Sequence, residues 1–243
     1  METPSRVATF AAAVGIAGAA ALALGPAAIQ IGAVSPFVGF RIFGLGLLLG
    51  LLAAVVGAAA LWRTRAATGR FGRGRAWIGA GLGLGIVAVV VVAAGSAGNA
   101  PIINDITTDL DDPPAFTAAR QIEANRGRDL GYPGEEFANQ QRAGYPDLGP
   151  ILLNDPPDAA FAQSQGAAAE LGWEIVYRDP ATGVFEAVAV TRVFRFVDDI
   201  VVRVRPQARG GSVVDVRSKS RDGKGDMGAN AARIRAFRDA LNS

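Results

Sequence analysis

The 243-residue chain contains no cysteine and no histidine. Without cysteine there are no disulfides and no thiol nucleophiles, and without histidine there are no imidazole general bases. The two absences also remove most zinc, copper and haem chemistry, so the sequence predicts no cofactor and no metal site. Lysine is scarce as well, occurring only at Lys219 and Lys224. An enzyme built from this chain would depend on carboxylates, hydroxyls, arginine or these two lysines.

Acidic residues are almost missing from the first 98 residues, which hold seven arginines and only Glu2. Residues 99–243 hold the other 17 basic and 21 acidic residues. The formal net charge of +2 therefore averages a basic part and an acidic part. For that reason the basic pI does not indicate nucleic-acid binding.

Three long apolar runs fill the basic part: Val7–Ile29, Ile42–Trp62 and Trp77–Gly98. Each has the length of about 20 residues that crosses a hydrocarbon core, and none contains an ionisable residue. We predict three transmembrane helices, with residues 1–98 as a membrane anchor that contacts the lipid bilayer. The uncharged interiors argue against a pump or transporter. For the first run a cleaved signal peptide remains an alternative, because small residues surround Leu22.

The arginines predict an orientation. Residues 63–75 contain five arginines and no acid, whereas residues 30–41 contain one arginine. The positive-inside rule places the arginine-rich loop in the cytoplasm. We therefore expect a multi-pass protein of the cytoplasmic (inner) membrane, with its amino terminus inside and everything after Gly98 extracytoplasmic, in the periplasm.

The remaining chain divides by pattern. Residues 99–157 are rich in proline and have no sustained apolar period, which predicts an irregular segment that wraps the fold. Residues 158–243 predict a compact α+β domain. We expect Asp158 to cap a helix that ends at Gly172, and we expect Ala229–Leu241 to form the last helix.

Four runs typical of strands lie between these helices: Trp173–Arg178, Val184–Phe194, Ile200–Arg205 and Ser212–Ser218. Their spacing predicts an antiparallel four-stranded meander with helices packed on one face, and a turn at 197–199. Period-two alternation places Tyr177 on the helix-covered face and Arg178 on the other. We expect that other, charged face to be solvated or to bind a partner.

A dense polar tract joins the last strand to the last helix, and it is the strongest candidate for a site. The candidate ligand-binding residues are Arg217, Ser218, Ser220, Arg221, Asp226, Asn230 and Arg233, with Asp198 and Asp199 from the preceding turn. In one interpretation the tract is a structural lock, in which Asp226 caps the last helix and Arg221 or Arg233 pairs with a carboxylate. In another, Arg217, Arg221 and Arg233 recognise an anionic group.

Two catalytic interpretations of the same tract remain open. Ser218 or Ser220 with Lys224 would form a Ser-Lys dyad of a hydrolase. Asp198, Asp199, Asp222 and Asp226 would alternatively gather around a magnesium or calcium ion.

Several separated motifs resemble one family: Asn104–Asp109, Pro113–Phe116, Tyr145–Asp147, Gly172-Trp173, Glu186-Ala187, Phe196–Asp199, and the Val-Asp-Val-Arg-Ser-Lys-Ser-Arg tract with Asp226, Gly228, Asn230 and Arg233 after it. They resemble the bacterial and plastid family called domain of unknown function 1499, over roughly residues 100–242. The resemblance implies transmembrane helices before the domain, as members often have, and it implies no established activity. Members often have a histidine where this chain has Asn104.

These observations favour a membrane-anchored protein whose extracytoplasmic domain is a binding or scaffold module of the cell envelope. Its expected partner is an envelope protein or an anionic ligand, not nucleic acid. The alternative is a hydrolase or metal-assisted enzyme centred on residues 217–233.

Overall fold

The computed structural model describes residues 3–65, 70–95 and 100–242. The chain divides into two compact units: Met1–Gly98 with Arg192–Arg195, and Asn99–Thr191 with Phe196–Ser243. Each unit is described by itself below. We call them the helical unit and the α+β unit.

The helical unit consists of three long helices: α1 (Arg6–Gln30), α2 (Pro36–Arg63) and α3 (Arg73–Gly95). All three are long and apolar enough to cross a membrane, which agrees with the expected apolar spans. Helix α2 begins six residues before the predicted Ile42, because Pro36 occupies its first turn and Ser35 caps it. The predicted end of the third span, Gly98, lies outside the described residues.

Glycines allow these helices to approach closely. A Cβ added at Gly57 of α2 would lie 2.4 Å from the backbone nitrogen of Ala80, and one at Gly83 of α3 would lie 2.3 Å from that of Ala54. Gly81 differs, since a Cβ there would meet nothing within 4 Å. Backbone contact through glycine is the usual way in which membrane helices pack without large side chains.

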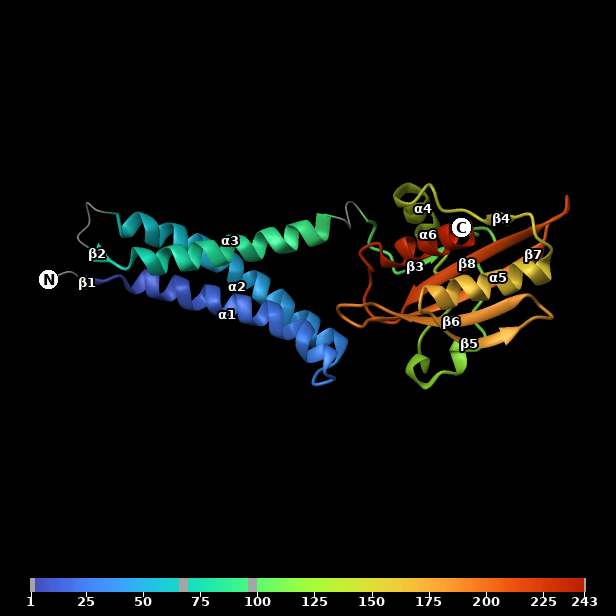
Figure 1. Ribbon diagram of the computed structural model, residues 1–243, viewed down its shortest axis with the longest axis horizontal. Helices are drawn as coiled ribbons and strands as arrows, with labels where there is room; N and C mark the ends of the chain where they lie inside the picture. The colour runs from blue at the N-terminus through green and yellow to red at the C-terminus, as the bar shows by residue number, and fades with distance from the viewer. Residues whose placement is uncertain (1–2, 66–69, 96–99, 243) are drawn as a thin grey trace. The chain divides into compact units, whose positions relative to one another are not determined.

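The α+β unit contains six strands: β3 (Asp105–Thr107), β4 (Ile151–Leu153), β5 (Glu174–Asp179), β6 (Val184–Val190), β7 (Val197–Pro206) and β8 (Ser212–Ser220). They form one antiparallel sheet of order β3-β8-β7-β6-β5, with β4 also paired to β8 (Figure 1). The α+β class is confirmed, but the prediction of four strands is wrong. The two extra strands have three residues each and come from the proline-rich segment, too short to show a period.

The predicted turn at 197–199 is also wrong. Asp198 and Asp199 lie inside β7, opposite Ser220 and Lys219 of β8. The chain reverses earlier instead, where the amide of Thr191 donates to the carbonyl of Phe196 over 2.8 Å. Two adjacent aspartates are tolerated in a strand here because each has a basic partner, as described below.

The helices of this unit are α4 (Glu135–Gly144), α5 (Pro157–Glu170) and α6 (Ala229–Leu241), with 3₁₀ turns η2 (Ala119–Gln121) and η3 (Glu123–Asn125). Helix α6 has the predicted bounds. Helix α5 starts one residue before the predicted cap Asp158, because Pro157 fits the first helical position and moves the cap to Pro156. Gly172 follows the helix with φ 73°, as predicted for a C-terminal glycine.

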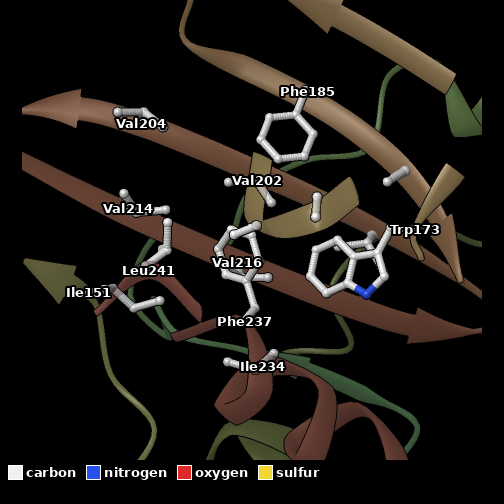
Figure 2. Close-up of a cluster of buried hydrophobic side chains, with 14 of the residues drawn as sticks. Ile151, Trp173, Phe185, Val202, Val204, Val214, Val216, Ile234, Phe237 and Leu241 are labelled. Carbon is white, nitrogen blue, oxygen red and sulfur yellow. The ribbon is translucent and has the colours of Figure 1, made fainter. Parts of the chain in front are cut away.

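Helices α5 and α6 cover one face of the sheet. The core between these helices and the sheet contains alternate residues of β6, β7 and β8, such as Phe185, Val202 and Val216, all fully buried (Figure 2). Trp173 stacks on Phe237 of α6 with ring centroids 4.9 Å apart. We call this the helix face.

The opposite face is covered too, by residues 109–132, which we call the strap. Phe116, Ala119 and Leu130 of the strap pack on Val201. Glu186, fully buried on this face, accepts hydrogen bonds from three consecutive strap amides, at positions 117–119, over 2.6–2.8 Å. The expectation of a solvated charged face is therefore wrong, because the strap supplies the partners that its charges need.

A bulge in β5 changes two predicted side-chain directions. The pairing with β6 shifts register between Ile175 and Tyr177, so Tyr177 lies opposite Glu186 and thus on the strap face. Arg178 lies on the helix face, where its Nε donates to Gln165 of α5 over 2.8 Å. One extra residue reverses a period-two pattern, which alternation alone does not reveal.

Candidate functional site

The candidate residues divide between the two faces of the sheet. Along β8, Ser218 and Ser220 point to the helix face, and Arg217 points to the strap face, as alternation requires. On β7, Asp198 and Asp199 are divided in the same way. The residues therefore form two networks separated by the sheet, not one cluster.

The helix-face network centres on Asn230 of α6, which is fully buried. Its Oδ1 accepts from Ser218 Oγ at 2.6 Å and from Arg233 Nη1 at 2.6 Å, and its Nδ2 donates to Ser220 Oγ at 3.0 Å. Arg233 also donates from Nη2 to Asp198 Oδ2 at 2.5 Å. These five side chains tie α6 to β7 and β8, and their polar groups are directed at one another.

Desolvation and charge act in opposite directions on Asp198. Burial raises the pKa of its carboxyl above the usual 3.8, and the positive charge of Arg233 and a hydrogen bond from Ser220 act to lower it. The net direction is upward. Asp198 is thus a carboxylate whose burial is compensated only in part.

Asp226 organises the turn before α6. Its Oδ1 accepts from the amide of Gly228 at 2.9 Å and its Oδ2 from the amide of Asn230 at 2.8 Å. Asp226 thus satisfies an amide in the first turn of α6, although the N-cap residue of the helix is Gly228. Its own amide donates to the carbonyl of Ile103 at 3.2 Å. Asn104 Nδ2 donates to the carbonyl of Gly223 at 2.7 Å. The loop 221–228 is therefore fixed to residues 103–104.

The strap-face network begins with Arg217, whose side chain is 2% exposed. Its Nε and Nη2 donate to the two oxygens of Asp105, both at 2.8 Å, and Lys219 Nζ donates to the same carboxylate at 2.8 Å. The guanidinium lies between the rings of Phe116 and Tyr132, with its Cζ 4.9 and 5.4 Å from their centroids. Arg217 is thus held by a bidentate ion pair and by two aromatic faces.

Strap carbonyls complete this environment. Arg217 donates to the carbonyl oxygens of Pro114 at 3.1 Å and Leu130 at 3.0 Å. Burial, followed by the charge of Asp105, raises the pKa of Tyr132 to about 12, so its hydroxyl stays protonated beside the guanidinium.

A second part of the strap-face network surrounds Asp199. Arg221 Nη2 donates to its Oδ1 at 2.7 Å, and Asn125 Nδ2 donates to its Oδ2 at 3.0 Å. Arg128 Nη2 donates to the backbone carbonyl of Ser220 at 2.8 Å. The strap is therefore joined to β7 and β8 at this point as well as at Arg217.

Several polar residues of the strap face lie outside the predicted set, among them Asp105, Asn125, Arg128 and Glu186. Asp105 and Glu186 lie in motifs that carry the family resemblance, and this was the available signal. Asn125 and Arg128 have no such signal, because they lie in an irregular segment and their partners in β7 and β8, Asp199 and Ser220, are more than 70 positions away.

The geometry bears on both catalytic interpretations. The hydroxyls of Ser218 and Ser220 are bonded to Asn230, and Lys224, the lysine of the predicted dyad, is exposed in the loop 221–228. Asp198 and Asp199 lie on opposite faces of the sheet, so they do not share an ion. Within residues 3–65, 70–95 and 100–242, no group of three or more acidic side chains is placed to hold a metal.

The protein therefore belongs to the class that combines three long apolar helices with an α+β domain, and this domain has an ion-paired polar network on each face of its sheet. Residues 105–241 match the family model described as Protein of unknown function (DUF1499). This range is more than half of the chain, and the chain belongs to that family. The predicted resemblance is confirmed. A comparison with the curated proteins finds no match.

Proposed function

We propose that the chain is a multi-pass protein of the cytoplasmic (inner) membrane whose α+β unit lies in the periplasm and serves there as a binding module of the cell envelope. Three apolar helices support the membrane anchor. An odd number of crossings puts the amino terminus and the α+β unit on opposite sides. The five arginines of residues 63–75 favour the cytoplasm for the end that carries them.

The observation that carries the binding role is the surface of the fixed loop 221–228. Met227, near its carboxyl end, is 60% exposed and has φ 52°, an uncommon conformation for a residue other than glycine. Ile102, which is 78% exposed, lies beside the same loop, since a Cβ at Gly225 would be 3.1 Å from its Cγ2. Strained backbone and exposed apolar side chains held by a buried network are typical of recognition surfaces.

The candidate residues then have a positioning role. Arg217, Arg221 and Arg233 are each bonded to an internal carboxylate, so their charge is already used within the domain. We propose that Asn230 and Asp226 hold the loop in shape and that Met227 and Ile102 contact an envelope protein. An apolar contact of this kind needs neither a nucleophile nor a metal, which favours binding over catalysis.

Site-specific photo-crosslinking in native membranes tests the proposal. A photoreactive residue replaces Met227 in one variant and Leu152 of β4 in the control, because both side chains are 60% exposed and apolar. We expect a discrete crosslinked envelope protein from position 227 and none from position 152. Equal crosslinking at both positions would refute a dedicated surface.

A second variant tests the positioning role. Asn230→Ala removes the centre of the helix-face network, and we expect it to reduce crosslinking from position 227. Hydrogen exchange of the β6 amides serves as the control for folding. Undiminished crosslinking in Asn230→Ala would show that the network does not shape the loop.

A fusion after Ser243 to a reporter that is active only outside the cytoplasm tests the orientation. We expect an active reporter. Activity of a cytoplasm-specific reporter at the same position would reverse the topology.

A further inference from the structure

Five exposed arginines gather at one end of the helical unit. Arg6 is the first residue of α1. Arg63 is the last residue of α2, and Arg65 lies two residues after it. Arg73 and Arg75 lie in the first turn of α3. The three helix ends meet there, since Ala8, Ala60 and Ala76 pack in one cluster. A short parallel pair, β1 (Thr3–Pro4) with β2 (Arg70–Phe71), joins the chain before α1 to the chain before α3. We call this the arginine end.

No carboxylate of the helical unit other than that of Glu2 is available to neutralise these charges, because residues 3–98 contain no acidic residue. Arg73 Nη1 donates to the carbonyl of Leu61 at 3.3 Å, and Arg75 Nη1 donates to Thr9 Oγ1 at 3.1 Å. Both acceptors are uncharged, so these bonds orient the guanidinium groups and leave their positive charge in place. The end therefore presents oriented cations in excess.

Aromatic side chains surround the same end. Trp62 is 63% exposed, Trp77 59% and Phe71 45%. The guanidinium of Arg65 lies over the Trp62 ring, with its Cζ 4.7 Å from the centroid. Exposed tryptophans at the ends of apolar helices are typical of the membrane interface, where lipid headgroups lie. Arginines at this level face phosphate groups.

We infer that the arginine end binds the headgroups of anionic phospholipids. The planar guanidinium pairs with phosphate oxygens in a bidentate way, and clusters of four to eight basic residues beside a membrane helix attract anionic lipid. The tryptophans favour lipid over a soluble polyanion, because they place the cations within the interface. This inference rests on the proposed insertion of α1–α3 in a bilayer.

Tryptophan quenching in vesicles tests the inference with the full chain. The chain has three tryptophans, and the third, Trp173, is 7% exposed in the core of the α+β unit, so it gives a constant background. Phosphatidylglycerol brominated near the headgroup is compared with phosphatidylcholine brominated in the same way, each at the same mole fraction. We expect stronger quenching by brominated phosphatidylglycerol, and we expect the difference to shrink as salt is added.

Variants identify the residues responsible. Each arginine near an anionic surface changes the affinity about fivefold, so Arg73→Gln with Arg75→Gln should remove most of the preference. Arg41→Gln is the matched control, since Arg41 is also exposed but lies near the start of α2, toward its other end. We expect Arg41→Gln to keep the preference.

The outcomes separate this inference from the proposed function. Equal quenching of the wild type by both lipids, or loss of the preference in Arg41→Gln alone, refutes the lipid site and leaves the anchor standing. Absence of quenching by either lipid shows that the helices do not insert, and this overturns the membrane anchor itself.

Discussion

Asp105→Asn is the most informative single change in the α+β unit. Asp105 is fully buried and accepts three hydrogen bonds from charged donors, two from Arg217 and one from Lys219, all at 2.8 Å. Asparagine keeps the shape, but it removes the charge and turns an NH₂ group toward those donors. Two buried cations then lose the carboxylate that compensates them.

The expected cost follows from this burial. Removing one partner of a buried ion pair costs about 3–5 kcal/mol, because the other charge stays buried without compensation. Total stabilities are about 5–15 kcal/mol, so the variant loses a large part of its margin. Asp112→Asn is the control: Asp112 also pairs with an arginine, Arg203, but its side chain is 70% exposed, and the expected cost is below about 1 kcal/mol.

Hydrogen exchange of the β8 amides in the full chain measures both costs. A loss of 3–5 kcal/mol lowers protection by about two to nearly four orders of magnitude. Replacing the whole group by apolar residues, Asp105→Leu with Arg217→Met and Lys219→Met, should recover most of the protection, since none of the three buried charges of this group is then left without its partner. If Asp105→Asn and Asp112→Asn lower protection equally, the argument from burial is wrong.

Three further predictions concern other parts of the molecule. Burial raises the pKa of Asp198 above 3.8, so protonation of this carboxyl favours the folded state. As pH falls through the raised pKa, the free energy of unfolding of the wild type should therefore rise relative to that of Asp198→Asn. Urea titrations at several pH values measure this difference. Asp147 has the opposite sign, because a hydrogen bond from Arg235 lowers its pKa: it contributes stability above pH 3.8, so Asp147→Asn should cost less than about 1 kcal/mol at neutral pH and nothing once pH falls below the lowered value. Gly57→Ala should destabilise the helical unit by an overpacking cost of about 1–3 kcal/mol, which lowers its thermal midpoint in detergent. Gly81→Ala, with open space around the new methyl group, should leave the midpoint unchanged.

Elements with a long, regular pattern are predictable from this sequence. The three apolar helices and α6 follow from unbroken hydrophobic runs and from a clear apolar stripe. The strands β3 and β4 do not, because three residues carry no period and both exist only by pairing with β8. The bulge at Val176 is equally invisible, and it reverses the directions of Tyr177 and Arg178.

The polar tract shows a similar limit. Its density of charged residues indicates correctly that polar contacts gather between β8 and α6. The partners come from elsewhere: Asp105 is 112 positions before Arg217, and Asn125 is 74 before Asp199. Local composition gives no distance information of this kind. The same limit explains the wrong prediction of a turn at Asp198 and Asp199. Their basic partners, Arg233 and Arg221, lie outside the strand, so the local sequence does not show that the two charges are compensated.

The charges at the strap face explain why the tract is so polar. The basic side chains bonded across this interface are Arg128, Arg203, Arg205, Arg217, Lys219 and Arg221, and the carboxylates bonded there are Asp105, Asp109, Asp112, Asp199, Asp215 and Glu186. The two sets are equal in number, so these bonded side chains carry no net formal charge. A neutral set has little attraction for an anion in solution, whereas we propose that the arginine end, where five arginines outnumber Glu2, attracts one. The two basic regions of this chain therefore differ: one holds the strap on the sheet, and we propose that the other binds anionic lipid.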